Sequence, residues 1–123
     1  MFKVISLDFG GTIAHETEKD YIIYDRVLKE LGYSTALNLI KKALKEARSW
    51  WREEKARTGR VWNTDAYLEF IERVFRALEL PTEIAPNFLK ILPRRVKFRV
   101  YDDVEPALKA LKRRGYRLII ISN

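Results

Sequence analysis

Two short apolar runs near opposite ends of the chain limit the folds that it can adopt. The first covers residues 2–9 and the second covers residues 118–121. Both are rich in β-forming side chains and apolar at nearly every position, which is typical of strands buried on both faces of a parallel sheet. A helical pattern that ends at Gly115 precedes the second run and supplies the crossover that parallel neighbours require. The two ends of the chain therefore predict an α/β core.

Residues 17–92 have the period of helices instead. Apolar side chains recur three and four positions apart, and glycine, proline or capping residues interrupt them. We expect four helices with short links, as in a small bundle. The expected N-caps are Ser34 for the second helix and Asn63 or Thr64 for the third, and Pro93 is expected to end the fourth.

This bundle stands between the first and second strands of the core, so the core is discontinuous in sequence. We assign residues 1–16 and 94–123 to a partial α/β core and residues 17–93 to an inserted helical domain. In the second core segment, Asp102 or Asp103 is expected to cap the helix. The predicted fold class is α/β with parallel strands and a helical insert.

Composition narrows the classes of function. The chain has no cysteine, which removes disulfides and thiolate metal sites and fits a reducing, cytoplasmic location. No apolar stretch approaches the roughly 18 residues of a membrane span, and no secretory signal is recognisable. The net charge of +7 attracts anions, but the charges are spread along helices without a nucleic-acid motif. We expect a small anionic substrate and neither membrane nor nucleic-acid partners.

A carboxylate stands where the first strand ends. Asp8 is followed by Phe9-Gly10-Gly11-Thr12. Open α/β sheets bind ligands at the carboxyl ends of their strands, and glycines let backbone N–H groups approach an anion. This pattern indicates an anion-binding site. The alternative is that Asp8 is an ordinary aspartate before a turn, with no catalytic or binding role.

Ser122 and Asn123 close the second strand. A hydroxyl at a strand end, beside a parallel strand that ends in aspartate, can donate a hydrogen bond to a phosphoryl oxygen. The alternative is a polar residue that simply ends the strand, and taken alone this signal is weak.

Together these features resemble the haloacid dehalogenase superfamily (HAD). Its first motif is an apolar strand followed by Asp-x-Asp-x-Thr or Asp-x-Asp-x-Val, which residues 4–12 match at all but one position. Its second motif is an apolar strand that ends in serine or threonine, which residues 119–123 match. The helical insert is similar to the cap that follows the first motif in this family. The resemblance covers essentially the whole chain and implies a Rossmann-like core with hydrolase chemistry.

The resemblance also implies roles for individual residues. Asp8 would attack the electrophile and form a covalent aspartyl intermediate. In the phosphatases of the family, this carboxylate and the backbone carbonyl at the position of Gly10 bind Mg²⁺, which offsets the repulsion between carboxylate and phosphate. The groups implied to hold phosphoryl oxygens are Gly10, Gly11, Thr12, Ser122 and Asn123.

Gly10 departs from the family pattern, which has a second aspartate there as general acid and base. Glycine can neither protonate a leaving group nor activate water. Dehalogenases and phosphonatases also lack this aspartate, so the leaving group either needs no proton or receives it from another residue. His15 and Glu16 follow closely and could reach the site, although the simpler interpretation is that they begin the linker to the insert.

The family's third and fourth motifs, a basic residue and an acidic pair, are not present. Asp102-Asp103 precedes a helix, so we interpret it as a cap and not as that pair. Mg²⁺ is coordinated octahedrally by six ligands, which is more than this chain provides. We therefore expect either a fragment of a longer protein or a sheet that another chain completes, with little activity from this chain alone. The open edge of the first strand also predicts self-association.

The main hypothesis is a Mg²⁺-dependent phosphatase of small phosphorylated metabolites. The first alternative, suggested by Gly10, is a 2-haloacid dehalogenase or a phosphonatase. The second alternative is an inactive fragment or interaction module.

Overall fold

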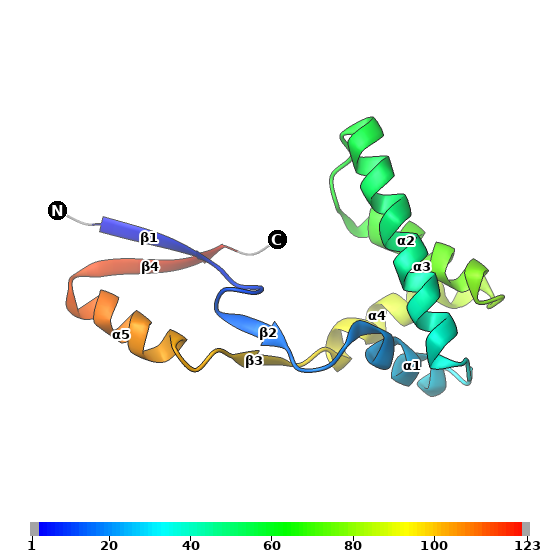
Figure 1. Cartoon of the computed structure of the whole chain (residues 1–123), viewed down its shortest axis with the longest axis horizontal. Helices are drawn as coiled ribbons and strands as arrows, with labels where there is room; N and C mark the ends of the chain where they lie inside the picture. The colour runs from blue at the N-terminus through cyan, green and yellow to red at the C-terminus, as the bar shows by residue number, and fades with distance from the viewer. Residues whose placement is uncertain (1–2, 122–123) are drawn as a thin grey trace. The chain divides into compact units, whose positions relative to one another are not determined.

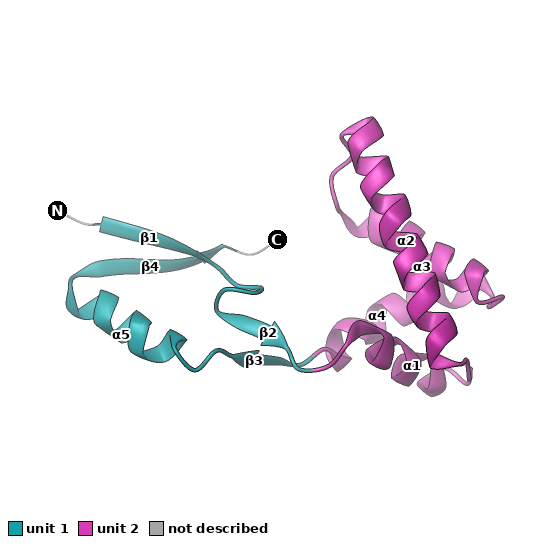
Figure 2. Ribbon diagram, in the orientation of Figure 1, with its two compact units in different colours: residues 1–17, 97–123 teal, residues 18–96 magenta. Residues whose placement is uncertain are grey.

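The computed structural model describes residues 3–121, which form two compact units. Unit 1 combines residues 1–17 with residues 97–123, and unit 2 is the continuous segment 18–96 (Figure 2). The chain thus leaves unit 1 after its first 17 residues, forms unit 2, and returns.

Unit 1 is built on two parallel strands from opposite ends of the chain. Strand β1 (Lys3–Asp8) pairs with β4 (Tyr116–Ile121), in a register that runs from Lys3 opposite Tyr116 to Asp8 opposite Ile121. Helix α5 (Val104–Arg113) leads directly into β4 (Figure 1). Gly115, with φ of +84°, makes the left-handed turn between them. The predicted α/β class with parallel strands is confirmed.

The predicted burial of both strands on both faces is wrong for the described residues. Val4 is 55% exposed, and Ile119, Ile120 and Ile121 are 46%, 59% and 58% exposed. The reason is that α5, with only ten residues, is the one helix in contact with this sheet. One short helix cannot cover both faces of a sheet, so apolar strand residues remain open to solvent.

A second, smaller sheet joins the two segments of unit 1. Strand β2 (Ala14–Glu16) pairs antiparallel with β3 (Phe98–Val100), with His15 opposite Arg99. The sequence pattern predicts neither of these strands. Three-residue strands are too short to show the alternation on which strand prediction depends.

Unit 2 is a bundle of four α-helices. These are α1 (Asp20–Glu30), α2 (Leu37–Thr58), α3 (Thr64–Ala77) and α4 (Ala85–Arg95), with a 3₁₀ turn, η1 (Thr82–Ile84), before the last. Helix α2 contacts α1 and α3, and α4 contacts the same two helices, so the bundle closes on itself. Between residues 3 and 121, no helix combines the length and the apolar character that crossing a membrane requires.

The core of unit 2 is apolar throughout its described part. Its largest fully buried side chains are Phe75, Phe88, Leu28, Ile40, Leu44, Ile71, Val27 and Val74. The Phe88 ring meets the rings of Tyr24 and Phe75 with centroids 5.0 and 5.1 Å apart. The helical period of the sequence is therefore confirmed in the core, where buried residues recur three and four positions apart on α1, α2 and α3.

Two of the predicted helix boundaries differ from the structure, and a third is confirmed in position but lacks the capping hydrogen bond. Helix α2 begins after Ala36, so Ser34 is not its cap. Pro93 lies inside the last turn of α4, where its missing N–H costs only one hydrogen bond. Asp103 occupies the N-cap position of α5, but its side chain accepts no capping hydrogen bond. The prediction for α3 is confirmed, because the Asn63 side chain accepts a bond from the Ala66 N–H at 2.8 Å.

We expect Asn63→Ala to lower the free energy of unfolding of unit 2 by about 1 kcal/mol, because the cap satisfies an N–H that the helix cannot. Ser34→Ala is the matched control and should change it by less than about 0.5 kcal/mol, the usual range for surface substitutions. Urea denaturation followed by tryptophan fluorescence reports on this unit, because Trp50, Trp51 and Trp62 all belong to it. An equal loss in both variants would contradict the assignment of the cap.

Candidate functional site

Asp8 is the last residue of β1, at the carboxyl end of the parallel pair. Its side chain is exposed, and it stands opposite Ile121, the last residue that the structure describes. The predicted neighbour relation between the two strands is therefore confirmed. Ser122 and Asn123 lie outside the described residues.

The turn after Asp8 is organised around one carbonyl oxygen. The Phe9 oxygen accepts hydrogen bonds from the backbone N–H groups of Thr12, Ile13 and Ala14, at 3.4, 3.0 and 3.1 Å. Gly11 returns a bond from its own N–H to the Ala14 carbonyl at 2.8 Å. Gly11 has φ of +78°, a left-handed conformation that favours glycine. These bonds fold the segment back so that Gly10 forms a bridge with Ala14.

The end of the turn is buried, whereas its first residues are exposed to solvent. Ile13 and Ala14 are 6% and 0% exposed, whereas Gly10, Gly11 and Thr12 are exposed. The Gly11 N–H is already occupied by Ala14. The backbone N–H and carbonyl of Gly10 take part in no hydrogen bond among the described residues. Among the described residues, the Gly10 N–H and the Thr12 hydroxyl are thus the donors that the turn leaves available to an anion, and the Gly10 carbonyl is one of its available acceptors.

The backbone conformation of Gly10 separates it from Gly11, because only Gly11 has a φ in the left-handed range. A Cβ atom built at Gly10 meets no atom of the described residues within 4 Å. Position 10 would therefore accept an aspartate without a steric or backbone penalty. The absence of a carboxylate there follows from the sequence and is not imposed by the shape of the turn.

His15 and Glu16 form strand β2 with Ala14, immediately before the chain passes from unit 1 into unit 2 after Thr17. The His15 ring packs on the Tyr101 ring, with centroids 4.7 Å apart. Its Nδ1 lies 3.1 Å from the Glu16 carbonyl oxygen. The sequence contained no signal for this packing, because residues 15 and 101 are brought together only by the pairing of β2 with β3.

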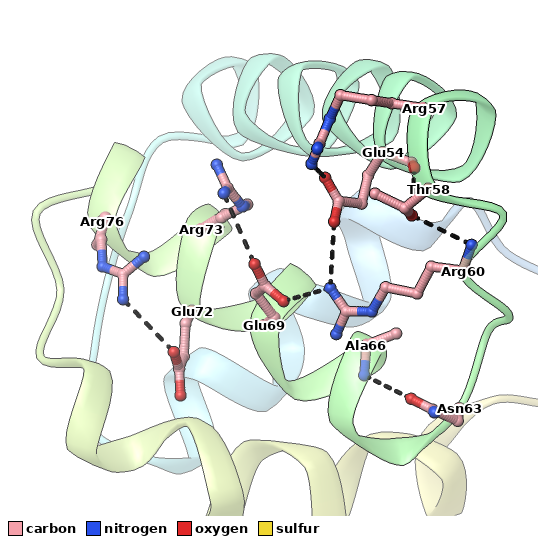
Figure 3. A network of polar contacts seen from close by, with 10 residues as sticks. All are labelled: Glu54, Arg57, Thr58, Arg60, Asn63, Ala66, Glu69, Glu72, Arg73 and Arg76. Carbon is pink, nitrogen blue, oxygen red and sulfur yellow. Dashed lines mark hydrogen bonds and ion pairs between the residues drawn. The ribbon is translucent and has the colours of Figure 1, made fainter.

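Arg57 and Arg60, which flank Gly59 in unit 2, are engaged in ion pairs. Arg60 contacts Glu69 at 2.7 Å and Glu54 at 3.8 Å, and Arg57 contacts Glu54 at 2.6 Å (Figure 3). The hydrogen bond from Arg60 holds the pKa of Glu69 below its usual value. These contacts join α2 to α3, so we interpret the arginines as structural.

Trp62 lies in the loop between α2 and α3 and is 45% exposed. Its ring contacts those of Trp51 and Phe70, at centroid distances of 4.9 and 5.7 Å. Trp51 is partly buried. The Trp62 ring is therefore partly exposed and packs against the rings of Trp51 and Phe70.

No cluster of three or more histidine or acidic side chains suited to a metal ion occurs within residues 3–121. Any metal near Asp8 would depend on oxygens from the backbone, from water or from the substrate, in addition to this one carboxylate.

A match to a known protein family indicates which of these features bear on function. A model of haloacid dehalogenase-like hydrolases matches residues 2–123. The chain belongs to this family. The match runs through both segments of unit 1 and through unit 2. Assignment to the family rests on nearly the whole sequence and not on the Asp8 motif alone.

A solved structure described as a predicted phosphoglycolate phosphatase from Haemophilus somnus 129PT also matches this HAD-like chain. The two are 21% identical, with a TM-score of 0.42. The match covers 99% of this chain and 52% of the other, so the chain spans about half the length of that protein. No curated protein sequence matches.

Proposed function

We propose that the protein is a phosphatase of small phosphorylated metabolites and that Asp8 is its covalent nucleophile. The observation that carries this proposal is an exposed carboxylate at the carboxyl end of a parallel strand, directly before an open glycine turn. Membership of a hydrolase family supports it.

In the proposed reaction, a carboxylate oxygen of Asp8 attacks phosphorus and the bond to the ester oxygen breaks. The leaving oxygen takes a proton, and an aspartyl-phosphate remains. Water then attacks the same phosphorus, releases inorganic phosphate and restores the carboxylate. The Gly10 N–H and the Thr12 hydroxyl are the donors that this turn offers to the phosphoryl oxygens. Ser122 and Asn123 remain proposed ligands from the sequence.

The residues present fit part of a Mg²⁺ site. The Asp8 carboxylate is exposed, and the Gly10 carbonyl accepts no hydrogen bond in the described part of the chain. Mg²⁺ commonly binds one or two carboxylates and completes its shell with water and substrate phosphates. When bound, the ion would reduce the repulsion between the carboxylate and the phosphate. Asp8 would hold it through its side chain and Gly10 through its backbone.

The proposal is tested by assaying the natural protein, at its full length, on phosphate monoesters. We expect hydrolysis of sugar and alkyl phosphates that requires Mg²⁺ and is lost with EDTA. The main competitor is a dehalogenase or phosphonatase, which is favoured by the absence of a side chain at Gly10. Halide release from 2-haloacids without metal would support that competitor. No activity on either class would support an interaction module.

Three further predictions from the sequence stand unchanged. We propose that unit 2 is a cap of the family type, that the open edge of β1 or an exchanged element permits self-association, and that the protein is cytoplasmic.

A further inference from the structure

The proposed reaction needs a group that exchanges protons, and the turn at Asp8 does not contain one. A leaving alkoxide must receive a proton, and the attacking water must lose one. Residues 9–14 are Phe, Gly, Gly, Thr, Ile and Ala, none of which serves as an acid or base near neutral pH. The first residues beyond the turn that can do so are His15 and Glu16.

The fold brings His15 close to this turn although it follows Asp8 by seven positions. The bridge between Gly10 and Ala14 puts these two backbones about 4.8 Å apart, the usual spacing of paired strands. His15 is the next residue after that bridge. Successive strand residues face opposite sides, so His15 and Glu16 point in different directions. Glu16 is exposed, whereas His15 is half-buried against Tyr101.

The hydrogen bonding of the His15 ring suits a proton carrier. The Glu16 carbonyl oxygen can only accept a hydrogen bond, so Nδ1, at 3.1 Å, must carry the proton. In the neutral ring this leaves the Nε2 lone pair available, and Nε2 has no partner among the described residues. Packing on the Tyr101 ring limits rotation of the imidazole. A base whose other nitrogen is held by a carbonyl is a recurring arrangement in proton transfer.

We propose that His15 is the general acid and base of the Asp8 reaction, a role that rests on the proposed function. In the first step, the imidazolium gives its Nε2 proton to the ester oxygen as the P–O bond breaks and the aspartyl-phosphate forms. In the second step, neutral Nε2 takes a proton from the attacking water, and the bond between phosphorus and Asp8 breaks. Each cycle returns His15 and Asp8 to their starting states.

The dependence of rate on the leaving group tests this role. p-Nitrophenolate leaves without a proton, whereas an alkoxide needs one. His15→Gln should therefore lower kcat/KM for an alkyl phosphate by roughly 100-fold or more, and for p-nitrophenyl phosphate by less than about tenfold. The retained p-nitrophenyl phosphate activity shows that the variant is folded. Glu16→Gln, a neighbouring exposed residue, is the control and should leave both values unchanged.

A second variant provides a rescue. Because position 10 has room for a side chain, Gly10→Asp in the His15→Gln background should restore part of the alkyl phosphate activity. If His15→Gln lowers kcat/KM equally for both substrates, or for neither, the proposed role of His15 is wrong. If the wild-type protein hydrolyses neither ester, or Asp8→Asn retains the activity, the proposed function itself fails. The two failures are thus distinguishable.

Discussion

Replacing Asp8 with asparagine should reduce phosphate-ester hydrolysis by the natural protein by about 10⁴-fold or more, the scale seen when a covalent nucleophile is removed. The amide has nearly the shape of the carboxylate but cannot form the aspartyl-phosphate. Asp8 is exposed and has no hydrogen bond or ion pair among the described residues, so the fold does not depend on its charge. Steady-state assay of kcat on p-nitrophenyl phosphate measures the loss.

The matched control is Asp103→Asn. Asp103 is another exposed aspartate of unit 1, and its side chain accepts no capping hydrogen bond. Its kcat should stay within about twofold of wild type, because a surface substitution of this kind rarely disturbs the fold. A comparable loss in both variants would indicate a general effect of charge instead of a nucleophile.

Phe75→Ala should have the largest effect on stability. Phe75 is fully buried in unit 2, and its ring meets the Phe88 ring edge-to-face. Removing a buried phenyl ring leaves a cavity and loses its transfer from water, which together cost about 3–5 kcal/mol. We expect unit 2 to unfold at a much lower urea concentration, measured by tryptophan fluorescence.

Leu39→Ala provides the comparison for Phe75→Ala. Leu39 lies on α2 of the same unit but is 50% exposed, so its truncation should cost less than about 1 kcal/mol. If Phe75→Ala costs no more than Leu39→Ala, the four-helix packing described for unit 2 is wrong.

The parts of the fold that could be predicted from sequence are those with a long periodic signal. The helices of unit 2 repeat their apolar positions over several turns, and Asn63 stands at a helix start with a side chain that can cap it. Strands β1 and β4 are six residues each; β4 is apolar apart from Arg117, and in β1 the apolar residues are Val4, Ile5 and Leu7. Their parallel pairing followed from the helix between them and not from the strands alone.

The parts that could not be predicted depend on contacts between distant residues. Strands β2 and β3 have three residues each, and they are recognisable only after residues 14 and 100 have paired. The same pairing puts His15 on Tyr101. Ser34 resembled Asn63 as a cap, but α2 begins after Ala36 and has no side-chain capping hydrogen bond. The exposure of Ile119–Ile121 depends on how many helices cover the sheet, which local pattern also does not show.

At the candidate site, the sequence was enough to locate Asp8 and the glycine turn. It did not show which backbone N–H groups of the turn are already hydrogen-bonded. That three N–H groups converge on the Phe9 carbonyl is a property of the folded turn. It leaves Gly10 and Thr12 as the available donors and removes the Gly11 N–H, which the motif alone would have included.

The most direct test of the central claim is to trap the covalent intermediate. The natural protein is mixed with p-nitrophenyl phosphate and Mg²⁺, quenched in acid during turnover, digested and examined by mass spectrometry. The account predicts one phosphoryl group on the peptide that contains Asp8, and none on the same peptide from Asp8→Asn. Turnover with an unmodified Asp8 peptide, or with the phosphoryl group on another residue, would contradict it.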